Sequence, residues 1–194
     1  MTNSNKKLIY DTFRETLNDM TPEEMVDFAF KDSASNCRNE RYLTELFKLN
    51  QSKSGTTAIV MLDVVSFQSI NYQYGSVFGQ KVLRHLGNFL LNAFKPTDEV
   101  IRYYGDVFVA VMYDTNPDEV LIQIGNIISQ VESLEFTSHP EVALNMVAGA
   151  YISNELTTEA LVNADRILHR TKKQNCNAIV EQVHASWSKE FILK

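Results

Sequence analysis

Apolar residues recur along this chain in two periods, one typical of helices and one typical of strands. Helical spacing covers residues 5–30 (as two segments), 39–49, 76–94, 117–134 and 157–174. Short apolar runs predict strands at Thr57–Val64, Glu99–Tyr103, Val107–Tyr113, Val142–Ile152 and Asn177–Val183. The first of these runs is almost wholly apolar, which predicts a central strand covered on both faces.

The two N-terminal helical segments carry an apolar stripe of their own. Thr21-Pro22-Glu23-Glu24 has the residues of a capping box with proline at the first helical position. The stripe must be covered, either by the main domain or by a second copy, and packing or dimerisation is favoured over a separate function. A polar break at Gln51–Gly55 then precedes the first predicted strand.

The order of the predicted elements favours one fold class. Tyr104-Gly105-Asp106 separates two strands and reads as the turn of a β-hairpin. The resulting order, β-α-β-β-α-β with additions, is the split βαβ or ferredoxin-like arrangement, an α/β (α+β) sandwich with an antiparallel central sheet flanked by helices. An N-terminal helical extension precedes it.

Composition and charge exclude several classes of function. A length of 194 residues suits about one domain with an extension. No apolar run approaches the roughly 20 residues that cross a bilayer, and the polar N-terminus is unlike a secretory signal, so we expect a cytoplasmic protein. Cys37 and Cys176 have no CxxC spacing and suit a reducing compartment. A net charge of -6 argues against nucleic acid as a partner.

Five segments, in order, resemble the motifs of the GGDEF family of diguanylate cyclases. Asp32–Arg41 resembles the family's DxLTGLxNRR, and Asp63–Tyr72 resembles DxDxFKxIND. Tyr74–Leu83 resembles YGHxxGDxxL, Arg102–Phe108 resembles the signature hairpin RxGGDEF, and Ala164–Asn177 resembles ADxALYxAKxxGRN. The resemblance implies a GGDEF domain over 32–183, of the nucleotidyl-cyclase type of sheet, between a helical extension at 1–31 and a C-terminal tail at 184–194.

The resemblance also implies a chemistry and its residues. In the family, carboxylates hold metal ions that neutralise GTP while a 3'-hydroxyl of one nucleotide attacks the α-phosphate of another across a dimer. Asp63 and Asp106 match the metal-ligand positions; the alternative is that Asp63 only caps its strand and Asp106 only forms the turn. Asn71 and Gln80 match the guanine-reading positions, with Gln80 in place of Asp. Lys172 matches a phosphate-contacting lysine, although a lysine near a helix C-terminus is also expected from the helix dipole.

The hairpin departs from the family pattern at two of its letters. It reads Tyr104-Gly105-Asp106-Val107-Phe108, so Tyr104 replaces the first glycine and Val107 replaces the glutamate. Valine cannot accept a proton or bind a cation, and a phenol ring is expected to crowd the nucleotide. These departures predict a degenerate domain that is not an enzyme.

The product-inhibition motif of the family, RxxD, also has a counterpart here. Lys95-Pro96-Thr97-Asp98 occupies its place with lysine for arginine, which loses the planar fork that pairs bidentately. The resemblance therefore implies a weakened remnant of an inhibitory site, and the alternative is a polar loop between helix and strand.

Three functions remain open from the sequence. The first is a catalytically inactive regulatory domain in cyclic-dinucleotide signalling that acts by protein interaction or by self-association through the N-terminal helices, with no cofactor required. The second is a nucleotide sensor that binds GTP through Asp63, Asn71, Asp106 and Lys172, with weak Mg²⁺ binding. The third is residual diguanylate cyclase activity that makes cyclic di-GMP from GTP.

Overall fold

The computed structural model describes residues 3–49, 55–184 and 187–194, in which helices cover both faces of one sheet. Its helices are α1 (Asn3–Asn18), α2 (Pro22–Phe30), α3 (Glu40–Leu49), α4 (Phe67–Tyr74), α5 (Ser76–Ala93), α6 (Pro117–Glu132) and α7 (Thr158–Gln174). Its strands are β1 (Arg38–Asn39), β2 (Thr57–Val64), β3 (Glu99–Tyr104), β4 (Val107–Tyr113), β5 (Met146–Ser153), β6 (Ala178–His184) and β7 (Trp187–Leu193). The predicted polar break at 51–54 lies outside the described residues.

The sheet has seven strands in the order β1-β3-β4-β2-β5-β6-β7. Among β3, β4, β2 and β5, each strand runs antiparallel to its neighbour. Strand β6 joins β5 in parallel. All eight residues of β2 are buried, which is why its sequence is almost wholly apolar. The predicted fold class, a helix-flanked antiparallel central sheet, is confirmed.

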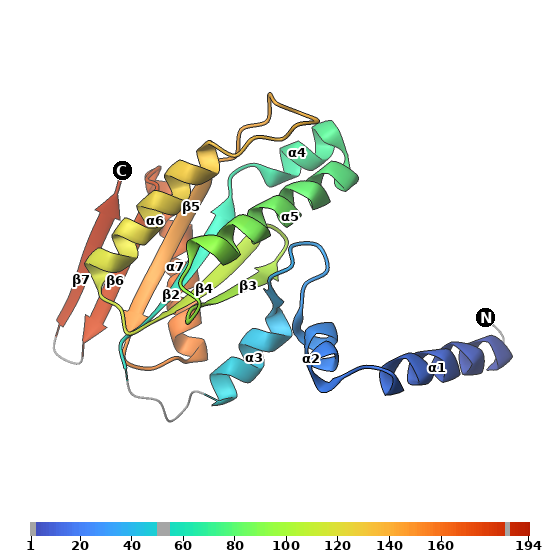
Figure 1. The fold of residues 1–194 in the computed structure, drawn as a ribbon. Helices are drawn as coiled ribbons and strands as arrows, with labels where there is room; N and C mark the ends of the chain where they lie inside the picture. The colour runs from blue at the N-terminus through green and yellow to red at the C-terminus, as the bar shows by residue number, and fades with distance from the viewer. Residues whose placement is uncertain (1–2, 50–54, 185–186) are drawn as a thin grey trace.

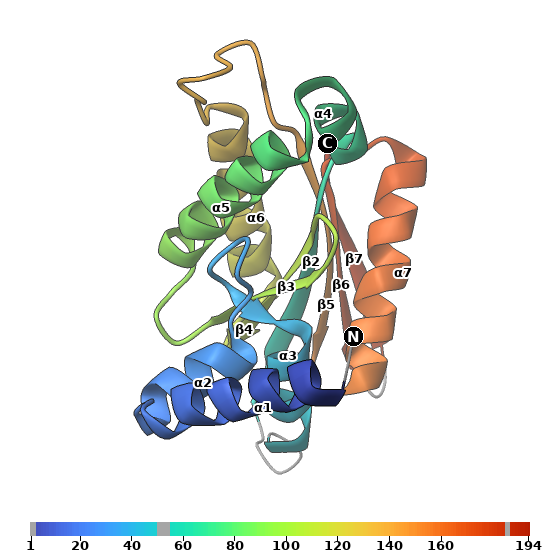
Figure 2. The ribbon, with the colours of Figure 1, turned by 90° about the vertical axis from the view of Figure 1, so that its right-hand side faces the viewer.

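Two helical layers enclose the sheet (Figure 2). Helices α5 and α6 lie against one face, and α7 lies against the other together with α3. Because side chains alternate along a strand, Ala58, Val60 and Leu62 pack under α5 and α6, whereas Ile59 and Met61 pack under α7. Asp63 is next in the second series, so it emerges on the α7 face at the end of β2.

The N-terminal helices project from this body (Figure 1). Helix α2 begins with the predicted capping box, in which the Thr21 hydroxyl accepts from Glu24 N–H and the Glu24 carboxylate accepts from Thr21 N–H. Asp27 of α2 pairs with Arg38 at 2.7 Å, and Phe13 of α1 contacts the Phe28 ring. Among the described residues, no helix is both long enough and apolar enough to cross a membrane.

The fold differs from the predicted elements at four places. The two-residue strand β1 was not predicted, because two residues carry no period. Helix α4 was not predicted, because its sequence FQSINYQY is mostly polar and buries only Phe67. Strand β7 was not predicted either; most of the segment expected as a C-terminal tail, 184–194, pairs along β6. Strand β5 begins at Met146 rather than at Val142, since residues 142–145 run as an irregular approach to the strand.

Candidate functional site

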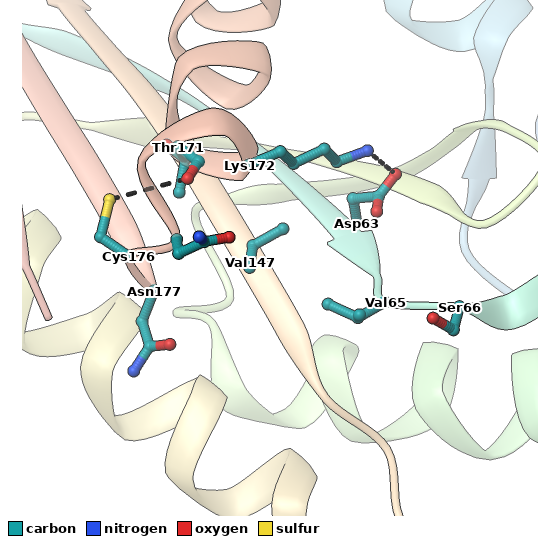
Figure 3. Close-up of a pocket in the computed structure, with 9 residues that line it drawn as sticks. Asp63, Val65, Ser66, Val147, Thr171, Lys172, Cys176 and Asn177 are labelled. Carbon is teal, nitrogen blue, oxygen red and sulfur yellow. Dashed lines mark hydrogen bonds and ion pairs between the residues drawn. The ribbon is translucent and has the colours of Figure 1, made fainter.

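Asp63 is the one acidic residue of β2, and it lies where the end of this strand faces α7. The residue is buried to 8% exposure because it continues the apolar series of a central strand. Its Oδ2 atom lies 2.7 Å from Nζ of Lys172 on α7 (Figure 3). A carboxylate this deeply placed needs a cation or hydrogen-bond donors near it, and the lysine supplies the cation.

Asp106 is brought next to Asp63 by the β3–β4 hairpin. Gly105 has φ +53°, a left-handed conformation that glycine adopts without strain, so the turn reverses the chain just before Asp106. Burial raises the pKa of Asp106, and the negative charge of Asp63 raises it further, against the lowering effect of Lys172. The two carboxylates therefore share one electrostatic site although 42 residues lie between them in the sequence.

Arg102 fixes the shape of this hairpin. Its Nε and one terminal nitrogen donate to Gly105 O at 2.8 and 2.6 Å, and its other terminal nitrogen donates to both Asp32 oxygens at 3.1 and 3.2 Å. Burial raises the pKa of Asp32, but hydrogen bonds from Ser35 and the charge of Arg102 outweigh it, so the pKa lies below its ordinary value. Asp32 thus stays ionised and holds the arginine against the turn.

A pocket of about 450 Å³ opens beside the Asp63–Lys172 pair. Its lining joins the turn after β2 to the end of α7 and the loop that follows: Asp63, Val65, Ser66, Val147, Thr171, Lys172, Asn175, Cys176 and Asn177 (Figure 3). Thr171 donates to Ala148 O at 3.0 Å and so ties the end of α7 to β5. Asn175 ends the helix in the left-handed conformation, which turns the chain along the pocket wall.

The Asp63–Asp106 pair suits one type of magnesium site, in which the ligand supplies part of the coordination. Mg²⁺ prefers oxygen ligands and is commonly held by one or two carboxylates together with substrate phosphates. Within 3–49, 55–184 and 187–194, no group of three or more His, Cys, Asp and Glu side chains is placed to hold a metal ion. Asp63 and Asp106 therefore fit a cation that arrives with, and is completed by, a phosphate-bearing ligand.

The two substituted hairpin residues are not among the residues that line the pocket, although Val107 pairs across the sheet with Asp63, which lines it. Tyr104 is 51% exposed and contacts the Tyr103 ring at 5.1 Å. Burial, and next the charge of Asp165 on α7, raise the pKa of the Tyr104 phenol. Val107 is 2% exposed and packs in the core under α7, and Phe108 is fully buried on the opposite face. Tyr104 is not among the residues that line the pocket, but the charges of Asp63 and Asp106 also raise the pKa of its phenol, so the crowding of a nucleotide by this ring stays a prediction.

Asn71 on α4 lies against Gly79 of α5, the residue before Gln80. A Cβ added at Gly79 would overlap the Asn71 carboxamide, so this glycine allows α4 to bring Asn71 against α5. Gln80 follows Gly79 and is exposed. The turn between β2 and α4, with Val65 and Ser66, connects this pair to the pocket.

The Lys95–Asp98 turn lies at the other end of the sheet. Asp98 precedes β3, whose first residue pairs with Val111, whereas Asp63 pairs with Val107 at the opposite end of β4. Both oxygens of Asp98 already accept backbone hydrogen bonds, from Lys95 N–H at 3.2 Å and Tyr113 N–H at 3.3 Å, and burial raises the pKa of Asp98. Lys95 is exposed. Asp98 thus stabilises a turn.

Several pocket residues were not predicted from the sequence. Val65, Ser66, Val147 and Asn177 line the pocket through their position next to a strand end or turn. Ser66 offered one usable signal, because a polar residue directly after a buried strand often marks the point where a chain turns at a site. Val147 offered none, since nothing in its sequence neighbourhood distinguishes it from other strand residues.

Comparison with known proteins gives a family for this arrangement. The family model described as "Diguanylate cyclase, GGDEF domain" matches residues 29–178. Diguanylate cyclase DosC of Escherichia coli K12 is 29% identical over 149 residues, which are 73% of this chain and 32% of DosC. The response regulator PleD of Caulobacter vibrioides is 27% identical over 168 residues, 81% of this chain and 37% of PleD. The chain thus spans about a third of the length of these relatives.

Solved structures share the fold. The GGDEF domain of DgcB from Caulobacter crescentus, in complex with c-di-GMP, has a TM-score of 0.69 at 20% identity and covers 79% of this chain and 95% of its own. The diguanylate cyclase SiaD of Pseudomonas aeruginosa, in complex with its activator SiaC, has a TM-score of 0.74 at 18% identity over 93% of this chain and 71% of its own. At these identities the likeness concerns the fold alone.

One prediction from the hairpin is wrong. Tyr104 and Val107 led to the expectation that this chain is not an enzyme, but the matched family and relatives such as DosC and DgcZ of E. coli are diguanylate cyclases, which are enzymes. The physical reason lies in what each position does here. The expectation rested on the two substituted hairpin positions, whereas the carboxylates that could hold a cation, Asp63 and Asp106, are both present and interact electrostatically.

Proposed function

The chain belongs to the GGDEF family, and from this premise we propose that it binds GTP with a divalent cation at the Asp63–Asp106 pair and converts two GTP molecules into cyclic di-GMP. Relatives named diguanylate cyclases support the reaction class. A cytoplasmic setting, where GTP is available, fits this proposal.

One observation carries the proposal: three charged residues from distant elements converge beside one pocket. Lys172 Nζ is 2.7 Å from Asp63 Oδ2, and the pKa of Asp106 is raised by burial and then by the charge of Asp63. Two carboxylates and an ammonium group are the set that a magnesium-bound triphosphate needs. The two carboxylates attract the cation, and the ammonium group attracts the phosphates.

Each residue then has a role in the proposed reaction. Asp63 and Asp106 would hold Mg²⁺, which when bound neutralises triphosphate charge. Lys172 donates to phosphate oxygens, and the pocket between Ser66 and Asn177 receives the triphosphate. Asn71, which lies against Gly79, offers the carboxamide that hydrogen-bonds the guanine edge, and Gln80 is the second residue for that edge. The 3'-hydroxyl of each GTP attacks the α-phosphorus of the other, so that two 3'-oxygen–phosphorus bonds form, two pyrophosphates leave and the two hydroxyl protons pass to solvent.

Two copies of the domain are needed, because each holds one nucleotide. We propose that the helical extension at 1–31 brings them together through α1, where Leu8, Ile9 and Tyr10 are 67%, 50% and 74% exposed. Large apolar side chains in a row on a projecting helix favour a protein partner. The same surface could receive a regulatory protein instead.

The test is conversion of GTP to cyclic di-GMP, followed by chromatography with and without Mg²⁺. We expect Mg²⁺-dependent product, and we expect Asp63→Asn and Asp106→Asn each to lower GTP affinity in Mg²⁺ by about 10- to 100-fold, because each removes one ionic ligand. Asp118→Asn is the matched control, since Asp118 is an exposed acidic residue of α6, which covers the opposite face of the sheet from α7.

Two results would count against the proposal. The first is Mg²⁺-independent binding of GTP that survives both carboxylate substitutions. The second is absence of cyclic di-GMP at every protein concentration tested although GTP and Mg²⁺ are bound.

A further inference from the structure

Lys172 occupies the place where a cation is required. Its ammonium group touches Asp63 at 2.7 Å, and its charge opposes the rise in the pKa of the neighbouring Asp106. The Asp63 side chain is 12% exposed, whereas the Lys172 side chain is 42% exposed. The carboxylate is therefore fixed in the protein, and the ammonium reaches it from the solvent side.

The same ammonium is the sole cationic group in the lining of the described pocket. Of its nine lining residues, Lys172 alone carries a positive charge. A triphosphate that enters the pocket therefore has to recruit this ammonium, and a divalent cation at Asp63 has to displace it. Both events pull the lysine in the same direction, away from the carboxylate.

From these contacts we propose that, in the nucleotide-free protein, the Lys172 ammonium is the counter-ion of Asp63 and occupies the position of the metal ion. When metal and nucleotide bind together, the ammonium moves from Asp63 to the phosphates. This inference rests on the proposed function of the site. It adds that metal and nucleotide bind cooperatively, because each one favours separation of the Lys172–Asp63 ion pair.

The structure of α7 suits this exchange. Thr171 donates to Ala148 O and to Ile167 O, both at 3.0 Å, so the backbone at position 172 is held against β5. The lysine stem has four rotatable carbon–carbon bonds and moves its point charge without moving the helix. The anchor is rigid, and only the ammonium relocates.

A counter-ion of this kind has a definite thermodynamic signature. Removing it should help a metal ion that binds alone, because the metal no longer competes with an ammonium. Removing it should harm a nucleotide, because a charge-assisted contact to phosphate is lost. A lysine that only stabilised the fold, or only contacted phosphate, would not produce effects of opposite sign.

The experiment compares wild type with Lys172→Met, and with Lys173→Met as a matched loss of one charge from the next position of α7. Mn²⁺ binding to nucleotide-free protein is followed by the electron paramagnetic resonance of free Mn²⁺. Binding of 3'-deoxy-GTP, which cannot react because it lacks the attacking hydroxyl, is followed by calorimetry in Mg²⁺. Unfolding temperatures of all variants show whether they are folded.

We expect Lys172→Met to bind Mn²⁺ alone about three- to tenfold more tightly and 3'-deoxy-GTP about tenfold more weakly, with Lys173→Met close to wild type. Lys172→Arg keeps the charge and should keep the weak affinity for Mn²⁺. The factor by which nucleotide strengthens Mn²⁺ binding should fall in Lys172→Met, because the ammonium that both ligands displace is absent. Mn²⁺ should then strengthen nucleotide binding by the same reduced factor, since coupling between two ligands is reciprocal.

Unchanged or weaker Mn²⁺ binding in folded Lys172→Met would overturn the inference, as would a nucleotide-free protein that never binds Mn²⁺ while wild type binds 3'-deoxy-GTP. Both results leave the proposed function intact. If Lys172→Met gains Mn²⁺ affinity and loses nucleotide affinity but wild type makes no cyclic di-GMP, the inference stands and the proposed reaction fails. If no protein binds the nucleotide in Mg²⁺, both are overturned.

Discussion

At the scale of single residues, Val107 is the most informative departure from the family pattern. It pairs directly with Asp63 across β2 and β4, so the two side chains share one face and lie next to each other. A glutamate here adds a third carboxylate beside Asp63, at a position that is 2% exposed. We expect Val107→Glu without metal to lose about 2–4 kcal/mol of unfolding free energy, because a like charge becomes buried.

Magnesium should return part of that loss, since a divalent cation converts repulsion among the carboxylates into coordination. The measurement is urea unfolding in EDTA and in excess MgCl₂. Val107→Gln is the control of equal size without charge, and it should be indifferent to MgCl₂. Equal destabilisation of both variants under both conditions would show that position 107 does not face the cation site.

Asp32 gives a prediction about pH at the same scale. Its folded pKa lies below the ordinary aspartate value of 3.8, so Asp32 adds stability that is fully present above that value and is lost as the pH falls through the lower folded value. We expect Asp32→Asn to unfold about 2–4 °C below wild type at about pH 5–7, and the gap to close below pH 3.8. Thermal unfolding across this range measures it, and a gap that widens in acid would contradict it.

At the scale of elements, Arg102 decides how firmly the β3–β4 hairpin presents Asp106. Its side chain is 18% exposed and joins Gly105 O to Asp32. We expect Arg102→Met to cost about 1–3 kcal/mol in unfolding free energy and to speed amide hydrogen exchange at residues 104–108, since a charged donor to the turn is lost. Arg166→Met is the control, because Arg166 is an exposed arginine of α7. Unchanged exchange in the hairpin would show that its backbone holds its own shape.

The elements that the sequence predicted well are those whose burial dictates their pattern. Strand β2 and helix α5 could be read from apolar residues alone, because both bury many side chains. Helix α4 escaped because it buries Phe67 alone, although Ile70 and Tyr74, which also pack on the core, complete a helical spacing with it. Strand β7 escaped because it lies at the edge of the sheet, paired with β6, and an edge strand leaves a weak local signal.

The site was predictable in its charged members and not in its shape. Asp63, Asp106 and Lys172 were all named from motif positions, and the structure brings these three together. The ion pair between Lys172 and Asp63 was not predicted, because it depends on how closely α7 packs against β5. This approach occurs at Gly149, where a Cβ would overlap Leu168 backbone atoms. Likewise, no sequence pattern indicated that the Tyr104 ring would lie outside the pocket lining.

At the scale of the whole molecule, the proposed chemistry and the remnant motif Lys95–Asp98 occupy opposite ends of the sheet. Register alone separates them, because β4 pairs with Asp63 through Val107 and with β3 near Asp98 through Val111. A ligand at the Lys95–Asp98 turn would therefore have no direct contact with the cation site. Any influence between the ends would have to pass through β3 and the hairpin, or through a second copy.

The reaction joins two nucleotides held by two copies, so its rate should depend on self-association. We expect activity per molecule to rise with protein concentration, and we expect Leu8→Glu combined with Ile9→Glu to shift that rise to at least tenfold higher concentration, because two exposed apolar side chains of α1 become charged. Asn5→Glu, an exposed polar position of the same helix, should have little effect. Sedimentation velocity reports the dimer, and the Lys172–Asp63 site should bind 3'-deoxy-GTP equally in all variants. Loss of dimer without loss of activity at low concentration would place the second half-site on another surface, since the chemistry still requires two nucleotides to meet.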